Sequence, residues 1–315
     1  MIETDLLKNR NEKENYKFAF VFHHDVDGLT GLALLLRALG LGLGNFVNIL
    51  FVPHDPNEEF QKIEADKIII VDIAITQKTW GSIQNLHGSV LWIDHHKPFQ
   101  ELSSLKFPEN VQIVLDPSSP SAVLLVQKYF NQNDEIANKL VELGTKADTW
   151  KLEPLVESWM NLDTAYSYFK KDKTILIQKL AEGDFEIDGE LKEVLEKYLQ
   201  EKEFAKKELL KNTVIREVKG HTIAIGFSPE ILSGSESADI LLKSTNSEIQ
   251  IIVKPQGWLS FRRRKDSNVN LIELAKIFGG GGHEYASGGE LGKTVNFENF
   301  SEIAEEIFSK ISSVL

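Results

Sequence analysis

Acidic and imidazole side chains stand at the ends of several apolar runs in this 315-residue chain. Residues 21–31 read VFHHDVDGLTG, the runs KIIIVD and VLWIDHH end in the same kinds of residue, and a further aspartate lies in GTKADTW. The residues concerned are His23, His24, Asp25, Asp27, Asp72, Asp94, His95, His96 and Asp148. A single aspartate at the end of a strand is usually a helix cap or a turn residue. Several such ends in one sheet instead indicate a shared site.

Carboxylates and imidazoles gathered without sulfur point to hard divalent cations. Several buried carboxylates repel one another strongly unless cations neutralise them. The chain has no cysteine, so the donors are oxygen and nitrogen, which suit Mn²⁺, or Mg²⁺, better than structural zinc. Enough carboxylate oxygens are present to bridge two metal ions, the arrangement that serves in-line displacement at phosphorus.

A parallel sheet would bring these residues together. Between Phe18 and Trp150 short apolar runs alternate with helix-like stretches, which predicts an α/β domain whose parallel sheet is covered by helices on both faces. In such sheets the carboxyl ends of the strands share one edge, where ligand sites form. We expect strands at 18–23, 46–52, 67–74, 89–95 and 111–116, and helices at 121–130, at 133–148 and from about Leu29 to Leu39.

The second half of the chain has a different pattern. Residues 151–187 look helical, and residues 188–212 place apolar positions at helical spacing on a heavily charged background, which predicts an exposed connector helix. Strands at 221–227, 248–254 and 257–263 and helices at 269–278 and 299–313 then predict a smaller α/β domain. The expected organisation is a first domain at 1–187, a helical linker at 188–212 and a second domain at 213–315.

Two clusters in the second domain could bind an anion. Residues 279–289 read GGGGHEYASGG, in which glycine backbone N–H groups can approach a phosphate closely and the N-terminus of a following helix would add a favourable dipole. Residues 260–265 read SFRRRK, and arginine binds phosphate bidentately. A flexible linker and a solvated edge strand are the alternative interpretations.

Composition limits the class of protein. Hydrophobic residues make up 42% and charged residues 26%, the balance of a soluble globular protein, and no run has the length of a membrane span or the pattern of a signal peptide. We therefore expect a cytoplasmic enzyme or binding protein. The net charge of −12 means that a polyanion is met locally, by bound cations or by a basic patch.

The remaining histidines and tryptophans give weaker signals. His54, His87 and His221 are expected at the surface or in turns. Trp92 and Trp150 are neighbours of the acidic cluster in the sequence, and we expect them to pack against its wall rather than to stack on bases.

These motifs, in this order, resemble the DHH phosphoesterase family, named for the triplet seen here at residues 94–96. HHDVDG resembles the first motif of that family in its H-x-D-x-D-G form, VDIA the second, WIDHH the third and KADTW the fourth. SFRRR and GGGGHEYASGG are similar to the associated C-terminal domain. The resemblance covers nearly the whole chain.

The resemblance implies an enzyme with two Mn²⁺ ions, Mg²⁺ being an alternative, and a role for each matching position. The implied metal ligands are His23, Asp25, Asp27, Asp72, His95 and Asp148, with Asp72 bridging the ions. His96 would contact the substrate phosphate or act as general acid, and Asp94 would orient the histidines beside it. The implied substrate-binding residues are Arg262, Arg263, Gly280, Gly281, Gly282 and His283. His24 has no counterpart in the family pattern.

The leading hypothesis is an exonuclease or oligonucleotide phosphodiesterase that releases nucleoside 5′-monophosphates from single-stranded DNA or RNA. The alternative is a small-substrate phosphatase or a cyclic or linear dinucleotide phosphodiesterase, of the nanoRNase or phosphoadenosine-phosphate phosphatase type. A non-catalytic replisome scaffold is a third hypothesis, which the occupied ligand positions argue against. The resemblance also suggests a helicase or replisome protein as a partner.

Overall fold

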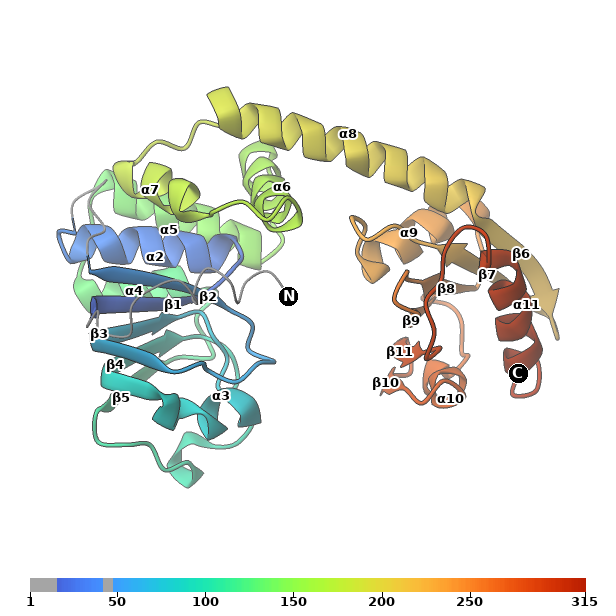
Figure 1. Ribbon diagram of the computed structural model, residues 1–315, viewed down its shortest axis with the longest axis horizontal. Coiled ribbons are helices and arrows are strands. Elements are labelled where there is room, and N and C mark those ends of the chain that lie inside the picture. The colour runs from blue at the N-terminus through green and yellow to red at the C-terminus, as the bar shows by residue number, and fades with distance from the viewer. Residues whose placement is uncertain (1–15, 42–47) are drawn as a thin grey trace. The chain divides into compact units, whose positions relative to one another are not determined.

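The computed structural model describes residues 16–41 and 48–315 (Figure 1). These residues form two compact units, one that ends at Leu195 and one that starts at Glu196. The division falls inside the long helix α8 (Gly189–Lys211). We describe each unit separately.

The first unit is built on a five-stranded sheet in the order β2-β1-β3-β4-β5, and every neighbouring pair of strands is parallel. The strands are β1 (Tyr16–His23), β2 (Ile49–His54), β3 (Ile63–Val71), β4 (Leu86–Asp94) and β5 (Val111–Leu115). All five carboxyl ends therefore lie at one edge of the sheet, as predicted. The predicted strand at 46–52 starts later, at Ile49, and its residues 46 and 47 lie outside the described residues.

Helices cover both faces of this sheet, which confirms the predicted α/β class. The helices of the first unit are α2 (Val26–Ala38), α3 (Gln77–Gly81), α4 (Ala122–Phe130), α5 (Glu135–Asp148), α6 (Pro154–Tyr168) and α7 (Thr174–Glu182). Helix α2 packs against α4, α5 and α7, and every residue from Val26 to Leu36 is buried. The other face packs on the segment around α3, with Ile75, Ile83 and Leu105 in its core.

Helix α2 begins three residues earlier than its apolar pattern predicted, at Val26 rather than near Leu29. Asp25 is the N-cap, and its side chain accepts a hydrogen bond from Gly28 N at 3.0 Å. An aspartate N-cap satisfies one of the free N–H groups of the first turn. The helix therefore begins among the acidic residues and not after them.

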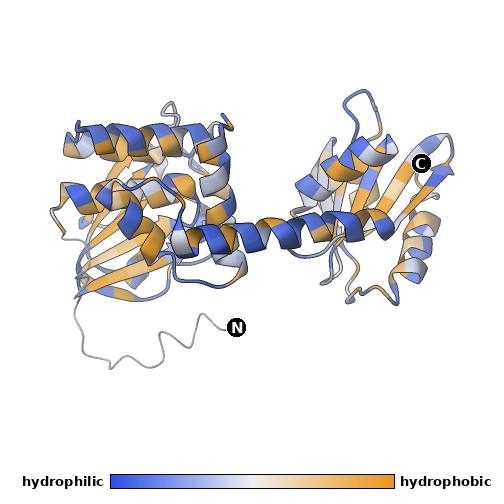
Figure 2. Ribbon diagram, turned by 90° about the horizontal axis from the view of Figure 1, so that it is seen from above, coloured by the Kyte–Doolittle hydropathy of each residue, from blue (hydrophilic) through white to orange (hydrophobic). Residues whose placement is uncertain are grey.

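Helix α8 is 23 residues long, has a largely hydrophilic surface (Figure 2) and corresponds to the helix predicted at 188–212. Its buried residues recur at helical spacing, which is how a charged helix keeps one apolar stripe. They include Leu191, Val194, Tyr198, Ala205 and Leu209. None of the helices within residues 16–41 and 48–315 combines the length and the apolar character that crossing a bilayer requires.

The second unit has a six-stranded mixed sheet in the order β10-β11-β9-β8-β7-β6. Its strands are β6 (Thr213–Val218), β7 (His221–Phe227), β8 (Ile249–Val253), β9 (Trp258–Arg263), β10 (Gly281–His283) and β11 (Ala286–Glu290). Its helices are α9 (Gly234–Thr245), α10 (Leu271–Lys276) and α11 (Phe300–Ile311). One apolar core joins β7, β8 and β9 to α10 and α11.

The glycine-rich segment differs from its prediction. No helix follows the four glycines, because the chain runs through β10, turns after His283 and returns as the antiparallel strand β11. Strands of glycine, alanine and serine carry no apolar alternation, so the usual sequence signal for a strand is absent. The prediction that a helix N-terminus after the glycines contributes to anion binding is therefore wrong.

Candidate metal centre

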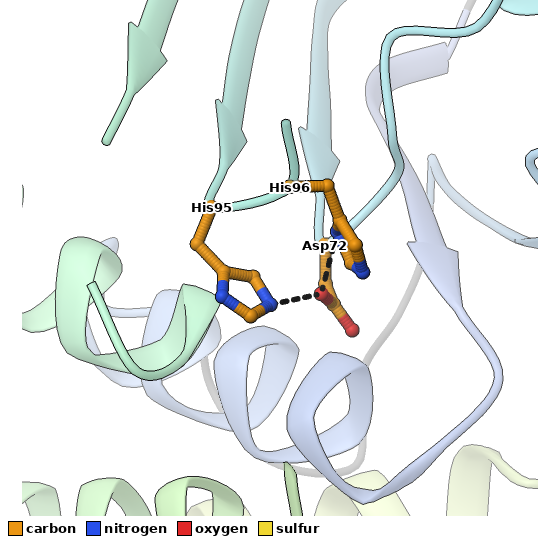
Figure 3. Close-up of side chains that lie close together, drawn as sticks. All are labelled: Asp72, His95 and His96. Atoms are coloured by element: carbon orange, nitrogen blue, oxygen red, sulfur yellow. Dashed lines mark ion pairs between the residues drawn. The ribbon is translucent and has the colours of Figure 1, made fainter. Parts of the chain in front are cut away.

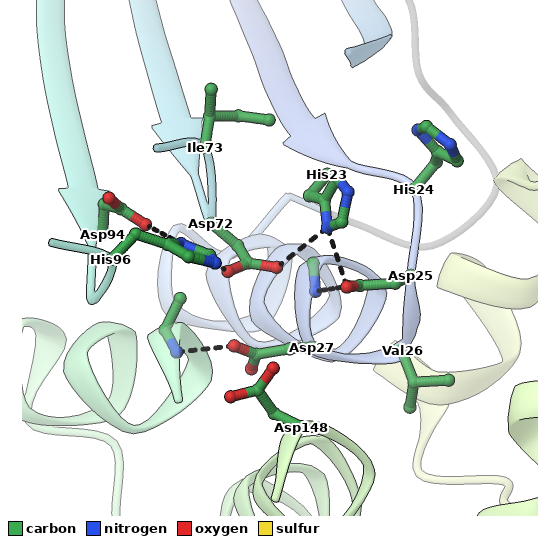
Figure 4. Close-up of polar contacts among 12 residues, drawn as sticks. His23, His24, Asp25, Val26, Asp27, Asp72, Ile73, Asp94, His96 and Asp148 are labelled. Atoms are coloured by element: carbon green, nitrogen blue, oxygen red, sulfur yellow. Dashed lines mark hydrogen bonds and ion pairs between the residues drawn. The ribbon is translucent and has the colours of Figure 1, made fainter. Parts of the chain in front are cut away.

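The ends of three neighbouring strands, β1, β3 and β4, bring the predicted ligands together (Figure 4). Three overlapping groups of side chains each offer ligand atoms that lie within 4.8 Å of one another. The groups are His23–Asp25–Asp72, Asp72–His95–His96 and Asp27–His95–Asp148. All six residues predicted as metal ligands are members, and Asp72 and His95 are each shared by two groups.

The first motif is compact because the end of β1 touches the start of α2. A Cβ atom at Gly28 would lie 2.0 Å from the carbonyl oxygen of His23, so no larger residue fits there. The contact holds His23 and Asp25 on the same small turn, where His23 Nδ1 lies 2.7 Å from Asp25 Oδ2. The role of Gly28 is thus to allow a close approach of backbone to backbone.

Asp72 occupies the centre of the cluster and is 2% exposed. Its φ of 60° places it in the left-handed region, which costs free energy for a residue other than glycine and is concentrated at functional sites. Asp72 Oδ2 lies 3.6 Å from His23 Nδ1 (Figure 4), and Asp72 Oδ1 lies 3.5 Å from His95 Nε2 (Figure 3). The two oxygens of one carboxylate therefore face different histidines.

His95 is oriented by a backbone carbonyl. Its Nδ1 lies 3.2 Å from Ser119 O, so the Nδ1–H donates there and leaves Nε2 directed at the carboxylates. His95 Nε2 is 3.8 Å from Asp27 Oδ2 and 3.7 Å from Asp148 Oδ2. A histidine that donates its other N–H to a carbonyl is the usual arrangement for a metal ligand. No sequence pattern pointed to Ser119, because a backbone acceptor has no residue preference.

Asp27 is tied to the N-terminus of α4. Its two carboxylate oxygens accept hydrogen bonds from Ala122 N at 2.6 Å and Val123 N at 3.0 Å. Ser121, the N-cap residue of α4, provides no side-chain bond, so Asp27 from a distant helix caps α4 instead. A carboxylate at a helix N-terminus also gains from the helix dipole. This link between residues 95 positions apart has no local sequence pattern.

His96 and Asp94 form a separate hydrogen-bonded pair. The two atoms His96 Nδ1 and Asp94 Oδ1 are 2.8 Å apart, and Asp94 is fully buried. The hydrogen bond to this carboxylate raises the pKa of His96. The contact fixes the ring so that Nε2 is the nitrogen free to meet another group.

The ionisable groups of the cluster interact strongly. Burial of the His23 ring opposes its protonation, but the nearby carboxylates of Asp25 and Asp72 outweigh this effect and raise the pKa of His23 to about 10. Burial and the neighbouring carboxylates act in the same way on His95, whose pKa rises to about 9. Burial, then repulsion by another aspartate, raises the pKa of both Asp27 and Asp72. Without metal, the protonated imidazoles of His23 and His95 therefore balance part of the negative charge of the carboxylates.

The residues present fit divalent cations. Among the residues that the structure describes, Asp72 Oδ1 and His95 Nε2 are buried polar atoms without a hydrogen-bond partner, although they lie 3.5 Å apart. Buried polar atoms almost always have partners, so two such atoms side by side in one cluster require an explanation. Nitrogen and oxygen donors with no sulfur match Mn²⁺ or Mg²⁺. A pair of cations would satisfy these atoms and neutralise the carboxylates around them.

Two predictions for residues near the centre are wrong. His54 was expected at the surface or in a turn, but it lies at the end of β2, pairs in register with His23 and is 6% exposed. Trp150 was expected to pack against the wall of the site, but its side chain is 72% exposed and its φ is 54°. Trp92 is fully buried in the apolar core, and its Nε1 donates to the carbonyl of Ile73, the residue after Asp72, at 2.8 Å.

The predicted substrate-binding residues all lie in the second unit, on β9 and in the segment through β10. The register pairs Arg262 with Ala286, and Ala286 with His283, so Arg262 and His283 lie on one face of the sheet. Arg262 donates to Ser235 Oγ at 3.0 Å and to the carbonyl of Phe261 at 2.9 Å. Arg263 points to the opposite face and donates to the carbonyl of Ser267. The structure therefore does not bring the two arginines together.

The three glycines at 280–282, the last two of them in β10, differ from one another in what the fold requires. A Cβ at Gly280 would lie 1.8 Å from Gly288 O, and Gly282 has a φ of 135°, so both positions need glycine for packing or conformation. A Cβ at Gly281 would meet nothing within 4 Å, and its φ lies outside the left-handed region. Of these three glycines, Gly281 is the one at which neither packing nor conformation explains the absence of a side chain.

Comparisons with known proteins match both units. A family model described as "DHH family, N-terminal domain" matches residues 17–147, and one described as "DHHA1 domain" matches residues 218–310. No curated protein sequence matches the chain.

Several solved structures share the fold. The pGpG-specific phosphodiesterase PggH from Vibrio cholerae is 17% identical, with a TM-score of 0.54 over 94% of this chain and 99% of that one. Exonuclease RecJ bound to manganese is 16% identical, with a TM-score of 0.57 over 99% and 93%. RecJ from Thermus thermophilus in complex with Mn²⁺ is 16% identical, with a TM-score of 0.52 over 99% and 54%.

Proposed function

Because this chain belongs to the DHH family, with a DHH domain followed by a DHHA1 domain, we propose that it is a phosphodiesterase dependent on two divalent cations, with Mn²⁺ as the working ion. The proposed substrate is single-stranded nucleic acid or a short oligonucleotide, cleaved to nucleoside 5′-monophosphates. The metal-bound RecJ structures are relatives in fold and support the choice of ion.

The observation that carries this proposal is the position of Asp72 between two sets of ligands. Asp72 Oδ2 faces His23, which belongs with Asp25, and Asp72 Oδ1 faces His95, which belongs with Asp27 and Asp148. Asp72 would thus be shared by the ligand sets of both proposed ions. Its left-handed backbone is the local cost of directing that carboxylate into the middle of the cluster.

The two cations, when bound, would polarise the phosphoryl group and activate a water molecule for in-line attack. The chain itself supplies a proton donor. Asp94 accepts from His96 Nδ1 and favours the protonated ring, so His96 Nε2–H can bind a phosphate oxygen or protonate the leaving oxygen. Asp94, being buried, keeps the ring in this orientation.

The second unit supports substrate binding at one small patch. Arg262 and His283 share a face of the sheet, and Gly281 leaves open space where a side chain would stand. Backbone N–H groups at such a glycine can approach a phosphate. We propose that this patch, defined by Arg262, Gly281 and His283, holds a phosphate of the substrate.

One observation favours a short substrate over a long strand. Of the three consecutive arginines, Arg263 donates to the carbonyl of Ser267, and Arg264 pairs with Asp266 and donates to Asn246 O. Arg262 lies on the face that carries His283, and within the described residues its own bonds go to a hydroxyl and a carbonyl rather than to a carboxylate. With a net charge of −12, a single cation does not make an extended track for a polyanion. A dinucleotide phosphodiesterase or small-substrate phosphatase is therefore the second candidate, while a helicase or replisome partner stays a prediction from the resemblance.

The test is hydrolysis in Mn²⁺ of single-stranded DNA and RNA of several lengths, labelled at the 5′ or the 3′ end, together with linear and cyclic dinucleotides and phosphoadenosine phosphate. Release of mononucleotides from short strands supports the proposal, and cleavage of dinucleotides alone supports the second candidate. No Mn²⁺ binding and no cleavage of any of these would overturn both.

A matched pair of variants links this activity to the metal centre. Asp72→Asn keeps the shape and tolerates the left-handed backbone, but removes the bridging charge, and we expect it to abolish hydrolysis. Asp116→Asn is the control, because Asp116 follows β5 as Asp72 follows β3, yet its side chain only accepts bonds from Ser118. Retention of most activity by Asp72→Asn would contradict the two-metal assignment.

A further inference from the structure

We propose that a buried ion pair outside the cluster, Lys173 with Asp163, positions the turn that carries two of the metal ligands. The inference rests on the proposed metal function of that turn. Lys173 and Asp163 are positioning residues here, because they act through the backbone of His24 and touch none of the proposed ligands.

The geometry joins three elements of the first unit. Lys173 Nζ lies 2.5 Å from Asp163 Oδ1 and donates to the carbonyl oxygen of His24 at 2.8 Å. Asp163 lies on α6, and Lys173 is the residue directly before α7. His24 stands between His23 and Asp25, in the turn from β1 to α2. The lysine thus holds the carbonyl that separates two proposed ligands.

The burial of this pair shows that it is not an ordinary surface contact. Lys173 is 8% exposed and Asp163 is 6% exposed. Removing two charges from water is costly, and the attraction between them roughly offsets that cost, so a buried pair is weak evidence for stability. A buried ion pair is better explained by a role in selecting one conformation. Here the conformation is that of the turn at His24, whose carbonyl accepts from Lys173.

Fixing the His24 carbonyl has a direct consequence for Asp25. The peptide group between His24 and Asp25 is planar, so the direction of the carbonyl also sets the direction of the Asp25 N–H. Asp25 then adopts the extended backbone of an N-cap, with φ −124°, which directs its carboxylate at Gly28 N and at His23. The backbone of His24 thereby acquires a role that its side chain lacks in the family pattern.

Apolar packing already holds α7 against the rest of the first unit, so the ion pair of Lys173 is not needed to attach this helix. Leu176, Ile177 and Leu180 of α7 are fully buried, and α7 packs against α2. Lys179, also on α7, offers a matched control. It pairs with Asp184 and Asp188, at 15% side-chain exposure, and none of its hydrogen bonds goes to the turn.

The experiment compares variants of the full chain. Lys173→Met removes the charge, Lys173→Arg keeps it, and the double variant Lys173→Met with Asp163→Leu replaces the pair by apolar groups. Such a replacement is often neutral for stability, so the double variant separates folding from positioning. Lys179→Met is the control. The measurements are Mn²⁺ affinity and stoichiometry from titrations followed by electron paramagnetic resonance, thermal unfolding, and amide hydrogen exchange of residues 24–28 in the metal-free protein.

We expect the double variant to unfold near the wild-type temperature, to bind one of its two Mn²⁺ ions at least about tenfold more weakly, and to exchange the amides of residues 24–28 faster. Lys173→Arg should recover part of the affinity, and Lys179→Met should match the wild type in affinity and exchange. If Lys173→Met alone does not fold, the double variant still gives the answer. Wild-type affinity and exchange in the double variant would overturn the inference. Absence of Mn²⁺ binding by the wild type would instead refute the proposed function, and the exchange data would still test the positioning.

Discussion

Loading the centre with metal should release protons, and two histidines with raised pKa values set the minimum number. The pKa of His23 is raised to about 10 and that of His95 to about 9 by the carboxylates that outweigh the effect of burial. At pH 7 groups with these pKa values are about 99.9% and about 99% protonated in the metal-free protein. A histidine must lose its proton to bind a cation. Binding of two Mn²⁺ ions at pH 7 should therefore release at least about two protons.

The pH dependence follows with a definite sign. Because protons compete with the cations, the overall affinity for the pair of ions should rise roughly 100-fold per pH unit between pH 7 and about 9, about tenfold between about 9 and 10, and then level off. The metal-free protein should show the opposite trend in stability. A histidine with a raised pKa stabilises the fold fully below its unfolded value, and this contribution is lost as the pH rises through 9 to 10.

Calorimetry measures the protons directly. Mn²⁺ is titrated into the metal-free protein at pH 7 in buffers with different enthalpies of ionisation, and the slope of the observed heat against that enthalpy is the number of protons released. His23→Asn should lower the number by about one. His87→Asn is the control, because His87 is exposed near the other end of β4. A slope of zero for the wild-type protein would show that the two histidines are neutral before the metal binds, and would refute the reasoning.

The other predictions concern the second unit and the tryptophans. Arg262→Ala should weaken oligonucleotide binding in a direct binding assay and leave Mn²⁺ affinity unchanged. Arg264→Ala should have little effect, because the Asp266 carboxylate already pairs with that guanidinium; equal losses would contradict the single-cation patch. Gly281→Ala should keep the wild-type unfolding temperature, since a Cβ there meets nothing, but should raise the KM for substrate, and an unchanged KM would remove this glycine from the site. Trp92→Ala should cost about 3–5 kcal/mol of stability in denaturant unfolding. The free energy of unfolding of Trp150→Gly should stay within about 1 kcal/mol of the wild type. Glycine relieves the left-handed backbone at this position, and this gain offsets the larger entropy that glycine loses on folding. A loss as large as that of a core residue would contradict the exposure of Trp150.

The edge of the first sheet could be predicted because its signals are local. Each of β1, β3 and β4 is an apolar run that ends at an acidic or imidazole residue, and a parallel sheet forces such ends to one edge. The proximity of Asp72 and His95 could therefore be predicted from the strands alone, because β3 and β4 are neighbours in the sheet. The start of α2 was predicted too late in the sequence. Asp25 serves both as N-cap and as a member of the cluster, and the sequence pattern suggested only the second role.

What could not be predicted depends on contacts between distant segments. Nothing near Lys173 in the sequence indicates that its ammonium group reaches the His24 carbonyl, and Ser119 contributes only a backbone oxygen. The run of arginines looked like one basic patch, but alternation along β9 sends Arg262 and Arg263 to opposite faces. Periodicity predicts which face a side chain occupies and where a strand ends. Contacts between distant segments, such as that of Lys173 with the His24 carbonyl, have no pattern in the sequence.

The bonds from Asp27 to the first turn of α4 have an evolutionary consequence. A descendant of this chain that no longer needed metal could replace Asp148, which is partly exposed at the end of α5 and accepts no hydrogen bond from another helix among the contacts described. It could not replace Asp27 as freely, since the loss would leave two buried N–H groups unpaired at a cost of about 1–3 kcal/mol each. In lineages that lose catalysis, Asp27 should therefore persist after Asp148 has changed, and its presence alone is a poor marker of an active enzyme.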